Sequence, residues 1–487
     1  MNWFAKLITQ YPETYEQMPG YGRTDAFGRI GNTVARYDDP VPLVGNVSFP
    51  SVWSMKYRDL FHYNGNTNSV LMRNIGQAFG LGAVLIDPTE NFSSTVNVPG
   101  LMDLEKLMYK IKVPEYTEIM SDAPLNKEKI LEGCNVYLSY CYRCHDGNKR
   151  VGPSADNQSL ISYKTFSIDF DGLKTDPNQA VLQAKPINGK ALRNVLFDFT
   201  KEVRDDFKSK HRSLVDKSFK FDVNKFPGMD SLNTNGTLNA VKETYMIRGF
   251  EEFRDTYFGL VGHNGAYNSY MNLDSKKEAD YFKNNYFTNH GDSTKYSKGL
   301  GAGYAARHLS GVWATPPYLH NGSIVSIMDL LTPPERRIKK FRTDSGKFDP
   351  STLGFQVEMG EDELKYFCDK SPEKCFRATN SHAENFYKSV SYVKKNNLNT
   401  FPTYKDINRG NFEGSGDSNS GHYFKVANSF TNSWDGLQGE ENLGMKTALI
   451  EFLKVLRPEP EYAWAGSEKY YKIESNSDGQ AVCKSIK

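Results

Sequence analysis

The sequence has no run of 18 consecutive apolar residues, so it predicts no transmembrane helix. It also lacks an excess of charge of one sign, because 60 Lys and Arg face 58 Asp and Glu, for a net charge of +2. This balance gives no reason to expect binding to nucleic acid or to an anionic membrane surface. Residues 1–9 are too few, and too soon interrupted by charge, to form the apolar region of a signal peptide.

Cysteine is scarce, with six in 487 residues, yet two of the six share one motif. The motif is Cys141-Tyr142-Arg143-Cys144-His145, or C-x-x-C-H, the attachment sequence for a c-type haem. Two thiols at this spacing reach one edge of a porphyrin, and the adjacent His145 ligates the iron. A redox C-x-x-C pair needs a βαβ context, and a zinc site needs a second ligand pair. The sequence offers neither, so we predict one covalently attached haem c.

A helix is predicted directly before the motif. Over residues 126–141 apolar side chains recur at helical spacing, which places Cys141 on a buried face with Ile130, Cys134, Tyr137 and Leu138. Asn126 is predicted to cap the helix, with Glu128 in its first turn. Gly133 lies on the neighbouring strip, where a second helix could approach closely.

Four cysteines remain outside the motif, and in an oxidising compartment they allow three pairings. Cys368 and Cys375 enclose a short loop, so we expect them to pair first. Cys134 and Cys483 would then pair by elimination. Cys134 could equally be a buried free thiol on the haem helix.

A second informative stretch covers residues 309–323. Two consecutive prolines force an extended segment here, and a rigid aromatic loop suits a wall over a porphyrin. Trp313 and Tyr318 are therefore predicted to bind the cofactor. His320 taken alone is more typical of a surface or structural histidine.

A third stretch places His422 ahead of an amphipathic helix that ends before Pro458. The apolar face of this helix consists of Met445, Ala448, Leu449, Phe452, Leu453 and Leu456. Such a helix is expected to pack across the haem-bearing helix, so His422 is predicted to be the second axial metal ligand beside His145. Methionine is the competing ligand, and histidine would give a lower potential within the roughly 0.8 V that axial ligands span.

The length of the chain is sufficient for two or three domains. We expect a mainly α-helical protein with an N-terminal region at 1–121, a cytochrome c-like haem domain at 122–457 and a C-terminal tail at 458–487. Polar stretches at about 146–300 and 361–420 are predicted to be long, loop-rich insertions into the haem domain.

Blocks scattered from about Trp3 to Leu456 carry a resemblance to a known family. These blocks are GYGRTDAFGRIGN at 20–32, RNIG at 73–76, the haem motif, GVWATPPYLHNGS at 311–323 and GHYF at 421–424. In this order they resemble dihaem c-type cytochromes of the rubber oxygenase type, which are distant relatives of bacterial dihaem cytochrome c peroxidases. The resemblance implies that His145 is the proximal and His422 the distal ligand of a C-terminal haem. It also implies a periplasmic or secreted location.

Family members carry another C-x-x-C-H upstream, on the haem that binds oxygen and cleaves substrate, whereas this sequence has one such motif. Residues 1–121 are therefore expected to be a remnant of a first haem or interdomain segment. One explanation is a truncated start, which would also account for the missing signal peptide. The other is the loss of a catalytic domain and retention of an electron-transfer module.

The sequence is compatible with three functions. The first is electron transfer through one haem with a redox partner protein or a small-molecule electron donor or acceptor. The second is a haem-dependent oxygenase or peroxidase, acting on this haem or on one in a missing segment. In that case Trp53, Phe61 and Trp313 would be pocket or relay residues, and His320 an acid/base group. The third, least expected, is a structural role with haem as a folding staple.

Overall fold

The structure is a computed structural model that describes part of the 487-residue chain. The described residues are 22–33, 43–53, 55, 61–64, 70–83, 85–86, 93–94, 97–108, 110–145, 150–153, 159–161, 164–167, 174–183, 303–344, 346–357, 359–378, 417–422, 442–456, 470–478 and 480–485. Most of the insertion predicted at 146–300 lies outside these residues. So does much of the insertion predicted at 361–420.

Two helices are the longest in the part of the chain that the structure describes. They are α7 (Lys127–Tyr140) and α20 (Leu443–Val455). The shorter helices are α3 (Ala26–Thr33), α4 (Val70–Gly80), α5 (Val98–Met108), α6 (Tyr116–Ile119), α8 (Tyr142–His145), α9 (Asn178–Gln183), α15 (Ile327–Leu330), α16 (Glu361–Lys370) and the 3-10 turns η5 (Val312–Ala314), η6 (Pro334–Arg336) and η7 (Pro372–Lys374). Within the described ranges, no helix has the length and apolar character needed to cross a membrane.

The described strands pair as separate two-stranded antiparallel ribbons. These ribbons pair β1 (Arg23–Thr24) with β2 (Val47–Ser48), β3 (Leu85–Ile86) with β4 (Ser93–Ser94), β5 (Arg150–Pro153) with β6 (Ser159–Ile161), β7 (Lys164–Ser167) with β8 (Gly303–Ala306), β9 (Lys340–Arg342) with β12 (Cys375–Arg377), β10 (Phe348–Asp349) with β11 (Gly354–Phe355), and β13 (Tyr471–Ser475) with β14 (Ala481–Ser485). Some of these ribbons join distant segments, as β7 and β8 do, and the core beside the haem motif is helical.

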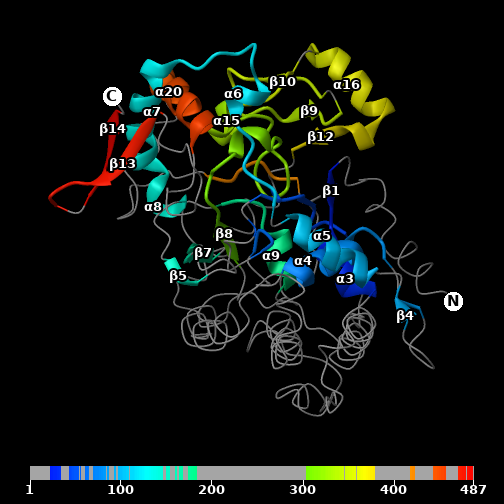
Figure 1. Cartoon of the computed structure of the whole chain (residues 1–487). Helices are drawn as coiled ribbons and strands as arrows, with labels where there is room; N and C mark the ends of the chain where they lie inside the picture. The colour runs from blue at the N-terminus through cyan, green and yellow to red at the C-terminus, as the bar shows by residue number, and fades with distance from the viewer. Residues whose placement is uncertain are drawn as a thin grey trace, which may run out of the picture.

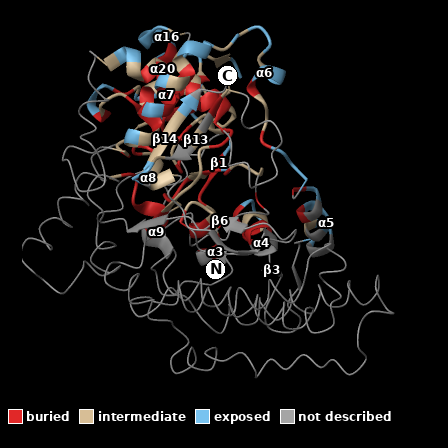
Figure 2. Ribbon diagram, turned by 60° about the vertical axis from the view of Figure 1, so that its left-hand side comes forward, coloured by how far each residue is buried: buried red, intermediate tan, exposed pale blue. Residues whose placement is uncertain are grey.

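That core is the contact between α7 and α20, which lie side by side in Figures 1 and 2. A Cβ added at Gly133 would lie 1.9 Å from the carbonyl oxygen of Ala448 and 2.8 Å from the Cβ of Phe452. Glycine is therefore needed for the two backbones to approach this closely. This finding confirms the close helix approach predicted at Gly133. The buried side chains around it include Ile130, Cys134, Tyr137, Leu449 and Leu453.

The start of α7 is also fixed to α20. The side chain of Asn126 caps α7 as predicted, accepting a hydrogen bond from the Lys129 N–H at 3.3 Å. The Asn126 N–H in turn donates to the Glu451 carboxylate of α20 at 2.9 Å. Because both the middle and the start of α7 are held, its C-terminal end, where the haem motif begins, has a defined position.

A C-terminal hairpin, β13–β14, packs on the other side of α7 (Figure 1). A disulfide joins Cys134 of α7 to Cys483 of β14, and the Tyr471 ring lies 4.7 Å from that of Phe452. The hairpin falls within the predicted tail at 458–487, and it covers the haem-bearing helix. A second disulfide joins Cys368 to Cys375, the pair expected first from the sequence. Of the two alternatives left open for Cys134, a free thiol or a pair with Cys483, the structure has the pair.

The N-terminal helices α3, α4 and α5 form a second group near α9 (Figure 1). Asp25 organises it: its carboxylate accepts hydrogen bonds from the N–H of Gly28 at the start of α3, at 2.7 Å, and from the N–H of Gly45, at 2.8 Å. Burial raises the pKa of Asp25 to about 6. One buried side chain thus joins α3 to the loop that leads into β2.

The α7–α20 contact predicts that Gly133→Ala destabilises the protein. The new methyl group meets backbone, which cannot rotate away, so the helices must separate at a cost of about 1–3 kcal/mol. Gly444→Ala is the matched control, because it lies early in α20 with no atom within 4 Å of the added Cβ. Denaturant unfolding of the two variants measures the difference, and equal stability would contradict the packing described here.

The hairpin predicts a stabilising role for the disulfide between Cys134 and Cys483. Cys483→Ala should lower the free energy of unfolding by about 2–4 kcal/mol, because this link closes a loop of 349 residues in the unfolded chain. Cys375→Ala opens a loop of 7 residues and should cost less. Thermal unfolding compares the two variants, and the opposite order would show that the hairpin adds little to the core.

Candidate haem site

The haem motif begins where α7 ends. Cys141 is the C-cap of α7, and its N–H donates to the Tyr137 carbonyl at 2.8 Å. The single turn of α8 follows, in which the N–H groups of Cys144 and His145 both donate to the Cys141 carbonyl, at 3.1 and 3.0 Å. Both motif cysteines are free thiols. This turn brings Cys141, Cys144 and His145 to the wall of one cavity.

His145 is oriented by a backbone carbonyl. Its Nδ1 lies 2.5 Å from the carbonyl oxygen of Arg307, the residue that follows β8. Because a carbonyl only accepts hydrogen bonds, Nδ1 carries the proton and Nε2 keeps its lone pair. Metal-binding histidines commonly use this arrangement, in which the second nitrogen donates to a carbonyl and fixes the tautomer.

His422 faces His145 across the cavity. The two imidazole rings are parallel to within 7°, and their centroids are 6.2 Å apart. An imidazole nitrogen lies about 2 Å from a metal that it binds, so two imidazoles on opposite sides of one ion place their centroids roughly 6 Å apart. The observed spacing is therefore that of two axial ligands, and the structure brings together both histidines predicted to bind iron.

The protonation states suit a ligand pair. Burial, followed by the charges on His145 and Arg337, lowers the pKa of His422 to about 3, so its ring is neutral at physiological pH. Neutral imidazole is the form that binds metals. Burial, followed by Cys144, raises the pKa of Cys141 to about 12. A redox-active C-x-x-C pair needs a lowered thiol pKa, so Cys141 does not fit that alternative.

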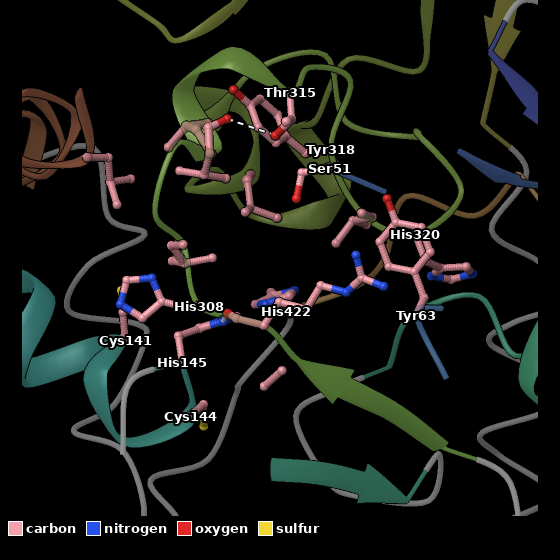
Figure 3. A pocket seen from close by; sticks show the side chains of 18 of the residues that line it. Ser51, Tyr63, Cys141, Cys144, His145, His308, Thr315, Tyr318, His320 and His422 are labelled. Carbon is pink, nitrogen blue, oxygen red and sulfur yellow. Dashed lines mark hydrogen bonds between the residues drawn. The ribbon is translucent and has the colours of Figure 1, made fainter. Parts of the chain in front are cut away.

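The cavity itself has a volume of about 260 Å³. Figure 3 shows the motif cysteines on one side of it and Tyr63 and His320 on the other, with His145 and His422 between them. Helices α15 and α20 supply an apolar wall of Ile327, Leu330, Leu331, Leu449 and Leu453. Two thiols, two facing imidazoles and an apolar wall are the groups that a covalently bound haem requires, so the residues present fit haem c.

The two aromatic residues predicted to bind the cofactor have different positions. Tyr318 lines the cavity as expected, and burial raises the pKa of its hydroxyl. Trp313 packs in the core instead, with its ring 5.2 Å from that of Tyr116 and 6.2 Å from that of Phe348. The η5 turn presents the neighbouring Val312 to the cavity. Trp313 therefore supports the cavity wall from behind.

Of the other aromatic residues considered for the pocket, Trp53 lines the cavity. Its indole N–H donates to the Ser310 carbonyl at 3.0 Å, which fixes the ring beside the 309–323 loop. Phe61 instead packs with Met55 and Met108 in a separate cluster. Trp53 is thus placed at the site, whereas Phe61 belongs to the core near α5.

His320 lines the far side of the cavity and is 5% exposed. Its Nε2 lies 3.1 Å from the Tyr304 hydroxyl, and its Nδ1 lies 3.4 Å from the Thr175 hydroxyl. The Tyr304 hydroxyl donates to the Asp176 carbonyl at 2.7 Å, so it accepts from His320. Burial lowers the pKa of His320 to about 4. A neutral ring held on both nitrogens suits a structural histidine better than an acid/base group.

The structure also places residues at the site that the sequence did not indicate. Arg307 orients His145 through its carbonyl, and its guanidinium lies 4.6 Å from the Tyr63 ring centroid. His308 lines the cavity too, but its Nδ1 accepts from the Ser310 N–H at 2.9 Å, which leaves the proton on Nε2. His308 therefore has an N–H group at Nε2, where a metal ligand would need a lone pair. The sequence signal that could have indicated it was its position directly before the 309–323 loop.

The burial of His320 predicts a pH-dependent contribution to stability. Its folded pKa of about 4 lies below the ordinary histidine value of 6.5, so between these values the unfolded chain binds more protons and stability falls as pH falls. The full effect is about 3 kcal/mol. His320→Gln should remove this dependence between pH 6.5 and 4, measured by denaturant unfolding. If the stabilities of His320→Gln and the wild type differed by the same amount at every pH, this prediction would be contradicted.

Comparison with known proteins gives one family match. Residues 303–342 match the family model described as "RoxA-like, cytochrome c-like". The matched region contains β8, Arg307, His308, the 309–323 loop and Arg337, so it supplies much of the cavity wall. It lies between the haem motif and His422 in the sequence.

Two curated proteins of Sinorhizobium fredii (strain NBRC 101917 / NGR234) are similar to this chain. "Uncharacterized protein y4iJ" is 24% identical over 375 residues, which cover 71% of this chain and 52% of that protein. "Uncharacterized protein y4iM" is 41% identical over 56 residues, which cover 12% of this chain and 13% of that protein. The chain thus spans about half the length of the first relative. The family match supports a RoxA-type cytochrome c region and a c-type haem-binding redox function.

Proposed function

We propose that this chain transfers electrons through one covalently attached haem c. Cys141 and Cys144 would form the thioether bonds, and His145 and His422 would occupy the two axial positions. The observation that carries the proposal is the pair of parallel imidazoles with centroids 6.2 Å apart, beside both motif thiols. Haem supplies the one-electron chemistry, and the protein supplies its position and surroundings.

The surroundings favour electron transfer over binding of a substrate to iron. Two protein ligands leave no open coordination position, which an oxygenase or peroxidase needs. The Arg307 carbonyl holds the ring of His145, and burial keeps His422 neutral. Helices α15 and α20 give the site an apolar wall, and burial and ligand type together set the potential of a haem.

The compartment and partners follow from the same chemistry. Disulfides such as Cys134–Cys483 and Cys368–Cys375 persist in oxidising compartments. Together with covalent haem attachment, they support a periplasmic or secreted location. The partner would be a redox protein or a small-molecule electron donor or acceptor.

A second candidate is a haem-dependent oxygenase or peroxidase of the rubber oxygenase type, whose catalytic haem lies in a further N-terminal segment. The RoxA-like family match favours it, and so does the greater length of the first relative, of which this chain covers 52%. In such a protein the haem at His145 and His422 would deliver electrons to the catalytic haem.

The ligand assignment predicts the response to carbon monoxide. The dithionite-reduced wild-type protein, with haem attached, should show no spectral change when carbon monoxide is added. His422→Ala should open one axial position, so that one carbon monoxide binds per haem and the Soret band shifts. His308→Ala is the matched control, because His308 lines the same cavity and should leave the spectrum of the wild type unchanged.

Two results would oppose this assignment. A Soret shift in the wild-type protein would mean that the iron is open or its ligand labile, which favours the oxygenase or peroxidase. A shift with His308→Ala and none with His422→Ala would transfer the distal role to His308.

A further inference from the structure

His422 lies in segment 417–422, whose residues form no helix or strand. Such a segment has no regular ladder of backbone hydrogen bonds that would hold a side chain in place. His422 nevertheless has a backbone φ of +58°, which a residue with a Cβ adopts only where its surroundings require it. The neighbours of segment 417–422 must therefore fix its path.

Arg337 makes two of these contacts, and they are the ones nearest to His422. It follows η6 and is 2% exposed. Its Nη1 donates to the carbonyls of Asn419 and, at 2.7 Å, of Gly421, the residue before His422. Its other nitrogens donate to the carbonyls of Leu330, at 3.0 Å, and Thr332, at 2.8 Å. One guanidinium thus joins the His422 segment to the end of α15, which forms part of the cavity wall.

Other anchors act on the earlier residues of the segment. Arg23 of β1 forms an ion pair with Asp417 at 2.8 Å. The N–H of Ser418 donates to the Asp176 carboxylate at 3.2 Å, and its carbonyl accepts from the Asn321 side chain at 2.9 Å. These contacts come from distant parts of the chain, and they fix the first two residues of the segment, Asp417 and Ser418.

Two further contacts act closer to the ligand. The side chain of Asn419 donates to the Ile338 carbonyl at 3.1 Å, and the Ser420 hydroxyl donates to the Lys174 carbonyl at 2.7 Å. A Cβ added at Gly421 would lie 2.9 Å from the Thr175 hydroxyl oxygen and 3.0 Å from a Leu319 methyl carbon. The close packing at Gly421 and the hydrogen bond from Arg337 to the Gly421 carbonyl are thus the constraints nearest to His422 in the segment.

We infer that Arg337 is the positioning residue for the distal haem ligand. It acts through the backbone carbonyls of Asn419 and Gly421 and holds the His422 ring opposite His145. This role rests on the proposed ligation of haem by His145 and His422. The planar guanidinium of Arg337 donates hydrogen bonds to four carbonyl oxygens at once, which the ammonium group of a lysine cannot do.

Carbon monoxide binding to the reduced haem-loaded protein tests this role, because the apparent affinity follows the fraction of molecules in which His422 is detached. Arg337→Gln should bind carbon monoxide at concentrations at which the wild type shows no spectral change, and it should lower the low-spin fraction of the ferric haem. Arg337→Lys should lie between this variant and the wild type. Arg336→Gln is the matched control, since Arg336 is the adjacent, exposed arginine, and it should behave as the wild type.

Gly421→Ala provides a second route to the same answer if Arg337→Gln does not fold. It displaces the backbone before His422 by contact with Thr175 and Leu319, and it should also increase the affinity for carbon monoxide. A role of Arg337 in stability alone would lower the unfolding temperature and leave the affinity of the folded protein unchanged. That result with either variant, or equal effects of Arg336→Gln and Arg337→Gln, would overturn the inference. Carbon monoxide binding to the wild type would overturn the proposed function as well.

Discussion

The separation of two imidazole rings is the constraint on which the rest of the described structure depends. A metal–imidazole bond has little freedom in length, so a site of this kind must hold both rings to within about 0.5 Å. His145 and His422 meet this requirement from different kinds of backbone. His145 lies in a helical turn that stabilises itself with its own hydrogen bonds, whereas the 417–422 segment depends on side chains from other parts of the chain. This difference explains why so many polar contacts lie on the distal side.

The proximal side takes its precision from the packing of α7. Three contacts hold this helix. Asn126 contacts Glu451 at its start, and further along the adjacent residues Gly133 and Cys134 contact Ala448 and the C-terminal hairpin. A helix held at one level could still pivot, whereas contacts at two levels oppose this. The end of α7 therefore presents Cys141 and the following turn to the cavity in a single orientation. Stability and cofactor geometry depend here on the same contacts.

The sequence predicted those features of the site that leave a local pattern. The C-x-x-C-H motif, the helix that precedes it and the close approach at Gly133 each follow from spacing within a short window. The contribution of Arg337 could not be predicted in this way, because it binds backbone carbonyls, and every residue has one. Trp313 illustrates a different difficulty. A single 3-10 turn directs adjacent side chains to different faces, so an aromatic stretch alone does not tell which residue faces the cavity. The spans proposed as insertions lie mostly outside the described residues.

The anchoring of the 417–422 segment bears on the type of reaction that this iron could support. Activation of oxygen or peroxide requires an open coordination position, so His422 would have to leave. Movement of its backbone would break the Arg337 contacts to the carbonyls of Asn419 and Gly421 together. Loss of the ligand by backbone movement would therefore need a concerted shift of the whole segment. Electron transfer has the opposite requirement, since the same two ligands should remain bound in both oxidation states. A rigid distal segment meets that requirement, so oxygen chemistry in a longer protein of this type would need a second iron with an open position.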